Sequence, residues 1–153
     1  MNSFADVFYH NQNWKPHPFQ KQTWKAIKNG ESGLLNAPTG YGKTFAIWFG
    51  ILDYYYSKSV KKKSNRKGLH TLWITPLRAL SKEIYLATNR VSDELELDYR
   101  IELRTGDTTT SARQKQIKNS PEALITTPES VHLLLATKNW RKFFENLEFI
   151  VVD

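Results

Sequence analysis

The chain has 153 residues, of which 40% are hydrophobic and 13% aromatic, enough for one folded domain with its own core. Lysine and arginine outnumber aspartate and glutamate by 22 to 15, and the net charge of +7 is compatible with a polyanionic partner but does not by itself indicate nucleic acid. The absence of cysteine excludes a disulfide framework and a thiolate metal site. Because no secretory signal or bilayer-spanning apolar run is visible, we expect a cytoplasmic protein with no membrane partner.

Five short apolar segments bounded by turn residues predict strands that are buried on both faces. They span Ser32–Ala37, Leu69–Thr75, Tyr99–Thr105, Ala123–Thr127 and Glu148–Val152. Helical patterns span Pro18–Asn29, Lys43–Ser57, Leu77–Arg90, Thr110–Asn119, Glu129–Ala136 and Trp140–Asn146. This alternation predicts an α/β fold of three layers around a mainly parallel sheet.

Two stretches need an interpretation beyond the strand and helix pattern. Residues Ser57–Lys67 are strongly basic with almost no apolar side chain, which predicts an exposed mobile loop, with a nucleic-acid tether as the alternative. Six aromatic residues lie on or just after the pattern that starts at Lys43. For these we favour core packing over a base-stacking platform; they are Phe45, Trp48, Phe49, Tyr54, Tyr55 and Tyr56.

A glycine-containing loop lies between the first predicted strand and the helix that begins at Lys43. Gly40 and Gly42 let the backbone approach an anion, and the exposed amides at the helix start supply partial positive charge. Lys43 is expected to reach terminal phosphates and the Thr44 hydroxyl to hold Mg²⁺. The alternative is a glycine turn that merely precedes a helix. The predicted phosphate-binding residues are Pro38, Thr39, Gly40, Tyr41, Gly42, Lys43 and Thr44.

The last residue, Asp153, follows the apolar run of the fifth predicted strand. In open α/β sheets ligands bind at the carboxyl ends of the strands, and an aspartate there can hold Mg²⁺, usually through water. The alternative is an acid at a strand end with a capping role. With a phosphate loop at Lys43, the metal role is the preferred interpretation.

Pro18–Gln20 precedes the phosphate loop by about twenty residues, and three further short motifs follow strand ends in a fixed order: Thr75–Leu80, Arg104–Thr108 and Thr126–Ser130. Together with the phosphate loop and Asp153, this succession resembles the first RecA-like domain of superfamily 2 DEXH-box helicases. Within the large helicase-related group it is most similar to bacterial ligase-associated DNA helicases of the DNA damage response. The resemblance covers about Trp14 to Asp153.

The resemblance implies roles for individual residues. Gln20 would read the adenine edge of ATP with Phe19 packed nearby, while Lys43 and Asp153 would serve catalysis through phosphate and Mg²⁺. The DNA backbone would be contacted by Arg78, Thr105, Thr108 and Thr127. A DNA ligase and a nuclease would be partners.

Each of these roles has a structural alternative. Gln20 could be a surface residue at a helix start, and Arg78 a residue of a first helical turn. The loop from Thr105 to Thr108 could be a glycine turn. Thr127 has a second reading as the N-cap of a helix whose first position is Pro128, and both readings can hold together.

The family pattern continues beyond Asp153 with a catalytic Glu, a His, and a second RecA-like domain. We therefore expect residues 1–153 to be the N-terminal part of the first RecA-like domain, truncated at its C-terminal end, with apolar surface or an edge exposed at the last strand. Alone it is predicted to be poorly stable and inactive. The rival classes are a non-catalytic nucleotide- or nucleic-acid-binding module and a nucleotide kinase or small GTPase; the latter has no use for the motifs at Thr75–Leu80 and Thr126–Ser130.

Overall fold

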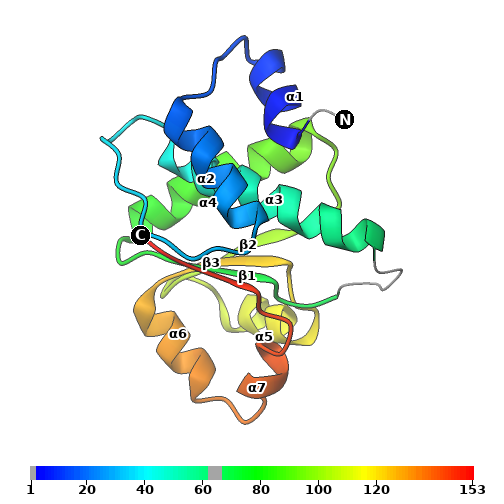
Figure 1. Cartoon of the computed structure of the whole chain (residues 1–153). Helices are drawn as coiled ribbons and strands as arrows, with labels where there is room; N and C mark the ends of the chain where they lie inside the picture. Colours follow the sequence, from blue (N-terminus) through cyan, green and yellow to red (C-terminus); the bar gives the residue numbers. More distant parts are fainter. Residues whose placement is uncertain (1–2, 62–66) are drawn as a thin grey trace. The chain divides into compact units, whose positions relative to one another are not determined.

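A computed structural model describes residues 3–61 and 67–153. The chain divides into two compact units, one of residues 1–65 and one of residues 66–153. We call them the helical unit and the sheet unit and describe each by itself (Figure 1).

Three helices make up the described part of the helical unit: α1 (Phe4–Asn11), α2 (Pro18–Lys28) and α3 (Lys43–Lys61). Helix α1 was not predicted from the sequence. It begins with a capping box in which Ser3 Oγ accepts from the Asp6 amide and the Asp6 carboxylate accepts from the Ser3 amide. This reciprocal pair satisfies two backbone donors that a helix start leaves free.

Aromatic side chains form the core of the helical unit. Rings from α1, α2, α3 and the α1–α2 connection lie with centroids 5.4–6.4 Å apart, in tilted or edge-on arrangements that aromatic pairs prefer. They belong to Phe8, Tyr9, Trp14, Trp24, Phe45 and Phe49. Trp48 and Phe49 are fully buried, which confirms core packing for these rings of α3. A Cβ at Gly50 would lie 2.9 Å from Ile27, so α2 and α3 approach closely there.

The basic stretch after Ser57 is partly helical, contrary to the predicted loop. Helix α3 continues to Lys61. Lys58 lies over the Tyr54 ring, 3.9 Å from its centroid, one helical turn away. Such a pair supports the last turns of a helix. Residues 62–66 of the predicted loop lie outside the described residues.

The predicted strand at Ser32–Ala37 is wrong: the segment has no regular secondary structure and belongs to no strand of the described sheet. Its large apolar residues are two leucines flanked by Gly33 and Asn36, and Leu34 is 96% exposed. A strand that is buried on both faces needs apolar side chains on both of them, and this segment has few. It forms part of the long connection that leads into α3.

The sheet unit holds four parallel strands: β1 (Thr71–Ile74), β2 (Ile101–Arg104), β3 (Ala123–Thr126) and β4 (Phe149–Val152). Their order across the described sheet is β2-β3-β1-β4. These strands lie within four of the predicted segments, and their parallel direction confirms the predicted crossover units.

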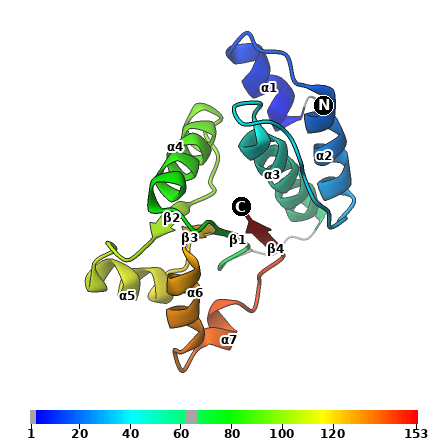
Figure 2. The same ribbon diagram turned by 90° about the vertical axis from the view of Figure 1, so that its left-hand side faces the viewer.

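Helices cover both faces of this sheet (Figure 2). Helix α4 (Arg78–Glu94) lies on one face, and α5 (Thr110–Lys118), α6 (Pro128–Leu135) and α7 (Trp140–Phe143) lie on the other. The predicted α/β fold of three layers is therefore confirmed. A core cluster links strands to the helices of the second face; its members are Leu69, Leu72, Leu124, Leu134 and Phe143.

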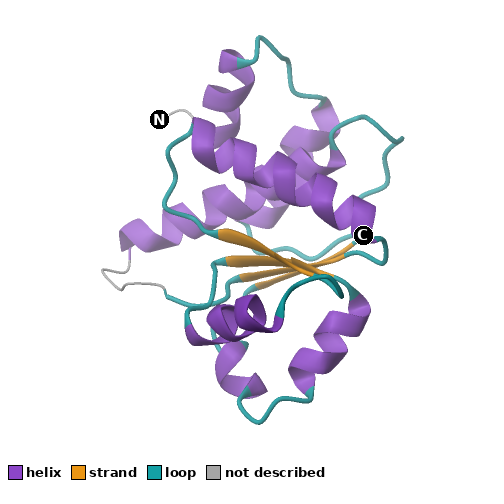
Figure 3. Cartoon of the chain, turned by 180° about the vertical axis from the view of Figure 1, so that it is seen from behind, coloured by secondary structure: helices purple, strands orange, loops and turns teal. Residues whose placement is uncertain are grey.

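Burial differs between the central and the edge strands. All four residues of β3 are buried, as predicted for a strand covered on both faces. Strand β4 pairs with β1 and is the last strand of the described sheet (Figure 3). Ile150 and Val152 are 62% and 76% exposed, so burial on both faces is wrong for β4, although the expected exposed edge is confirmed. An edge strand has one neighbour and correspondingly less cover.

Candidate nucleotide and nucleic-acid site

The glycine loop of the helical unit has the backbone that a phosphate-binding loop requires. Gly40 and Gly42 have φ angles of +82° and +84°, in the left-handed region that favours glycine. Helix α3 starts directly afterwards at Lys43, and its first turn contains no acidic residue. The free amides and the dipole of this helix could therefore bind an anion, and no carboxylate in that turn would compete with it.

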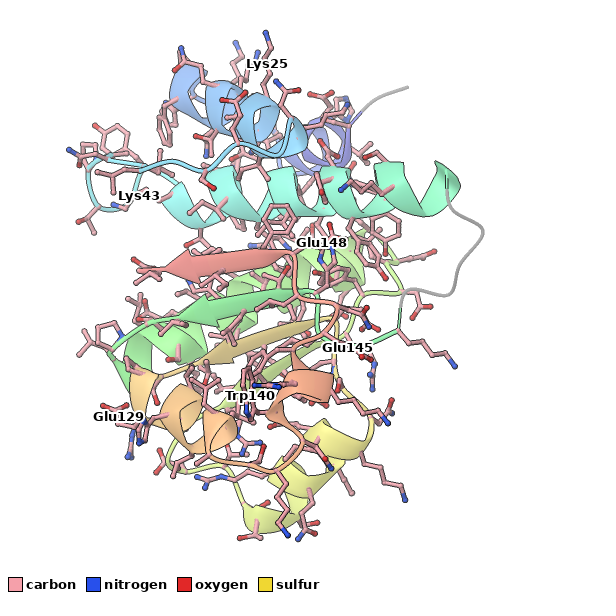
Figure 4. The ribbon with its side chains drawn as sticks, turned by 60° about the horizontal axis from the view of Figure 1, so that its bottom comes forward. Lys25, Lys43, Glu129, Trp140, Glu145 and Glu148 are labelled. Atoms are coloured by element: carbon pink, nitrogen blue, oxygen red, sulfur yellow. The ribbon has the colours of Figure 1, made fainter. Side chains whose placement is uncertain are left out.

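Lys43 closes this loop from the start of α3 (Figure 4). Its Nζ donates to Ala37 O at 2.7 Å and to Pro38 O at 3.2 Å. These acceptors are neutral carbonyl groups, and a phosphate would be a stronger, charge-assisted partner for the same ammonium group. The loop thus fits the polyphosphate of a nucleotide.

Gln20 is 2% exposed and joins the start of α2 to the glycine loop. Its Oε1 accepts from the His17 amide at 2.8 Å, and its Nε2 donates to Gly42 O at 3.0 Å. The alternative of a surface residue at a helix start is therefore wrong as to exposure, though correct as to position. The contact with Gly42 spans 22 residues of sequence, and no pattern in the chain signals it.

Three rings lie next to one another beside Gln20. Phe19 stacks on His17 with a centroid distance of 5.8 Å and an interplanar angle of 12°, and the His17 ring lies 5.5 Å from that of Tyr41. Tyr41 is half exposed. The helical unit thus brings the predicted residues Phe19, Gln20, Tyr41 and Gly42 together.

In the sheet unit, every predicted functional residue follows the carboxyl end of a strand. Arg78 begins α4 shortly after β1, Thr105 follows β2, Thr127 follows β3 and Asp153 follows β4. Since the strands are parallel neighbours, these ends share one edge of the sheet. Asp153 is exposed, and its amide donates to Ile74 O at 2.9 Å, which extends the pairing of β4 with β1.

The loop after β2 is internally hydrogen-bonded. The Thr105 hydroxyl accepts from the Asp107 amide at 3.3 Å, and the Thr108 hydroxyl accepts from the Thr105 amide at 2.9 Å. Thr105 is 5% exposed, whereas Thr108 is partly exposed. Arg78 reaches this loop and donates through Nη1 to Asp107 Oδ1 at 2.8 Å.

Thr127 occupies the N-cap position of α6, with Pro128 at the first helical position and Glu129 in the first turn. Its hydroxyl lies 3.3 Å from Ser130 Oγ and makes no capping bond to the backbone. The residue is 4% exposed. The capping interpretation is therefore correct for position and for Pro128, but not for the side-chain bond.

Two further arginines lie beside the loop after β2, and the sequence reading assigned neither a role. Arg104 is 5% exposed, and burial, together with the positive charge of Arg113, lowers its pKa from the ordinary value. Arg113 on α5 donates through Nη2 to Thr105 O at 3.1 Å and Gly106 O at 3.2 Å. No sequence pattern signals the position of Arg113, because the turn between the loop and α5 brings this residue back to the loop.

The chain belongs to the DEAD/DEAH box helicase family, whose pattern matches residues 17–153. The resemblance to helicases of this kind, found from the order of short motifs, is thereby confirmed at the family level. Homologues of the chain are ATP-dependent helicases.

Two curated relatives illustrate the similarity. The chain is 33% identical over 152 residues to the Lhr helicase/uracil glycosylase of Escherichia coli (strain K12), which covers 91% of this chain and 10% of that protein. It is 34% identical over 144 residues to the ATP-dependent helicase Lhr-Core of Sulfolobus acidocaldarius, covering 89% and 16%. The chain thus spans a small part of the length of these relatives.

The fold is similar to that of the Mycobacterium smegmatis helicase Lhr bound to single-stranded DNA and AMP-PNP. The TM-score is 0.72 at 28% sequence identity, and the match covers 99% of this chain and 20% of the other. Within residues 3–61 and 67–153, no helix is both long and apolar enough to cross a bilayer.

Proposed function

We propose that this chain supplies the ATP-binding and DNA-contacting part of an ATP-dependent DNA helicase. The single observation that carries the proposal is the row of motif residues at the carboxyl ends of four parallel strands, from Arg78 after β1 to Asp153 after β4. Ligands of open α/β sheets bind at such an edge. The similar Lhr helicase is bound to single-stranded DNA and AMP-PNP, which supports the same two ligand classes here.

The nucleotide is assigned to the glycine loop and its neighbours. Lys43 exchanges its bonds to two carbonyl oxygens for bonds to the terminal phosphates. The amides from Gly40 to Thr44 bind the other phosphate groups of the nucleotide. The Gln20 side chain bonds to His17 and Gly42 and also to the Tyr9 hydroxyl, and we assign its amide to the adenine edge of the nucleotide. Phe19 packs beside the base.

Thr44 and Asp153 are the residues proposed to hold Mg²⁺, through a hydroxyl and a carboxylate oxygen. The described residues contain no group of three or more His, Cys, Asp or Glu side chains that could hold a metal ion by itself. The remaining ligands of the proposed ion would be phosphate oxygens and water. When bound, Mg²⁺ neutralises charge on the phosphates.

The DNA backbone is assigned to the sheet unit. Arg78 and Thr108 are the proposed residues with exposed or partly exposed side chains, and they are expected to touch phosphates directly. Thr105 and Thr127 are buried, so we assign them mainly to shaping the loops that follow β2 and β3. Contacts of this kind hold a strand without reading its sequence and weaken with salt.

Residues 1–153 tested alone are proposed to bind ATP without appreciable turnover. Asp153 is assigned to the metal, and none of the other assigned residues can act as the base that activates water. The whole protein is proposed to act in the cytoplasm, in DNA repair, alongside a DNA ligase and a nuclease.

The test of the phosphate assignment is binding of labelled ATP to wild type, Lys43→Ala and Lys25→Ala. Lys25 is an exposed lysine of α2, so its removal changes the net charge equally without touching the loop. We expect Lys43→Ala to weaken binding at least about tenfold, which corresponds to 1.4 kcal/mol, and Lys25→Ala to bind like wild type. Equal affinities for all three proteins would sink the assignment.

A further inference from the structure

Arg78 lies against the backbone of the loop after β2. A Cβ built at Gly106 would overlap Nη2 of Arg78 and would lie 3.1 Å from its Cζ. The guanidinium group therefore rests where only a glycine leaves room. From this position its Nη1 reaches Asp107 Oδ1 at 2.8 Å, and both side chains are mostly exposed, at 62% and 75%.

Three arginines lie in the elements around the loop after β2, whose own residues include one acid, Asp107. Besides Arg78, Arg113 donates to two carbonyl groups of the loop, and the Arg104 guanidinium group bonds to α5; within the described ranges neither arginine is paired with a carboxylate. Arg104 has two long bonds, to Arg113 O at 3.4 Å and to Gln116 Oε1 at 3.5 Å. Asp107, the acid of this loop, pairs with the exposed arginine, Arg78.

We propose that Asp107 is a built-in competitor of DNA phosphate for Arg78. This inference rests on the proposed function, because it requires that Arg78 binds the DNA backbone. In the free protein the Asp107 carboxylate occupies the guanidinium group that a phosphate would take. When a strand binds, Arg78 exchanges the carboxylate for phosphate oxygens, and when the strand leaves, Asp107 takes Arg78 back.

The chemistry of the two anions makes this exchange possible. A carboxylate and a phosphate present the same type of anionic oxygen acceptors to the planar fork of an arginine. An exposed ion pair contributes little in water, so opening it costs little and the exchange is readily reversible. A carboxylate left beside a bound phosphate also repels it, which makes Asp107 unfavourable for the DNA-bound state.

Asp107→Asn keeps the size of the side chain and removes its charge. We expect single-stranded DNA to bind about two- to fivefold more tightly, because Arg78 no longer has to leave an ion pair and the repulsion is gone. The affinity should also fall more steeply with salt, since the bound state of the variant has no freed carboxylate that takes up a cation from solution.

The experiment is fluorescence anisotropy of a labelled oligothymidylate with the full 153-residue chain, at several salt concentrations. The charge-matched control is Asp98→Asn. Asp98 is also exposed but precedes β2, at the amino end of the strand opposite to the loop. The double variant Asp107→Asn/Arg78→Ala tests whether the gain in DNA affinity caused by Asp107→Asn requires Arg78.

A gain with Asp107→Asn that exceeds that of Asp98→Asn and vanishes without Arg78 would support the proposal. Weaker or unchanged binding, a gain matched by Asp98→Asn, or a gain that survives in the double variant would overturn it. If the wild type binds the oligothymidylate but Asp107→Asn binds no better, the inference fails and the DNA role of the sheet unit stands. No binding by the wild type or any variant would overturn the DNA role itself and this inference with it.

Discussion

Two loops of this molecule place a polar side chain over a glycine, and they hold that side chain very differently. At Gly42 the amide of Gln20 is 2% exposed and bonded at both its oxygen and its nitrogen. At Gly106 the guanidinium of Arg78 is mostly exposed and tied by an ion pair to Asp107. The first arrangement is fixed by burial, whereas the second sits in water, where such pairs open easily.

This difference matches the tasks proposed for the two loops. A loop that binds a nucleotide gains affinity when it is pre-formed, because less conformational freedom is lost on binding. A loop that holds and releases a DNA strand repeatedly needs contacts that exchange at low cost. Both loops use a cation, Lys43 or Arg78, but neutral carbonyls hold the first and a carboxylate holds the second.

The largest effect is expected for Gly42→Ala. The new Cβ would lie 2.6 Å from Gln20 Nε2, and the φ of +84° disfavours any side chain. Since the buried amide cannot move aside, we expect ATP to bind at least about tenfold more weakly, a loss of 1.4 kcal/mol or more. Labelled-ATP binding measures this.

Gly40→Ala is the matched control for that substitution. It has nearly the same φ, +82°, but nothing lies within 4 Å of a Cβ placed there. Gly40→Ala should therefore suffer from backbone strain alone, and its affinity for ATP should fall clearly less than that of Gly42→Ala. If the two alanine variants behave alike, the contact with Gln20 has no part in forming the nucleotide site.

A smaller effect is expected for Arg78→Ala. Loss of one exposed phosphate contact should weaken binding of single-stranded DNA about three- to tenfold at low salt. The slope of log affinity against log salt concentration should fall by about 0.7, the value for one phosphate on a single strand. Anisotropy titrations over a range of salt give both quantities. An unchanged slope would mean that Arg78 makes no phosphate contact.

The smallest effect is expected for Gly106→Ala. The new Cβ meets only the end of a flexible, exposed side chain, which can swing away. We expect the free energy of unfolding to change by less than about 0.5 kcal/mol, as for ordinary surface substitutions. Urea denaturation tests this. A loss of stability well above about 0.5 kcal/mol would show that Arg78 is held firmly in place and cannot swing away.

The elements could be predicted from the sequence wherever local chemistry decides them. The four strands of the sheet unit are apolar runs, and Thr127–Pro128 signals the start of α6. The Ser3 and Asp6 pair is a similar start signal for α1, and the sequence reading passed over it. At Ser32–Ala37 the apolar pattern was misleading, because the segment has no neighbour in the described sheet.

The candidate site was predictable in its residues but not in its contacts. The glycines and the lysine of the phosphate loop, and the acid after the last strand, could be recognised from their residue types and their order along the chain. The bond from Gln20 to Gly42 and the pair of Arg78 with Asp107 join residues far apart in sequence, and no periodicity encodes them. They arise when the start of α2 meets the glycine loop and the start of α4 meets the loop after β2.

The strand order has a consequence for how the sheet unit is made. Strand β1 lies between β3 and β4, so Thr71 pairs with Ala123 on one side and with Phe149 on the other. A ribosome releases β1 well before either partner exists. Contacts this distant along the chain slow folding, since long loops must close before the pairing rewards them. Newly made β1 therefore stays unpaired for that time, and Leu72 and Trp73, which are buried in the finished sheet, are exposed to other proteins.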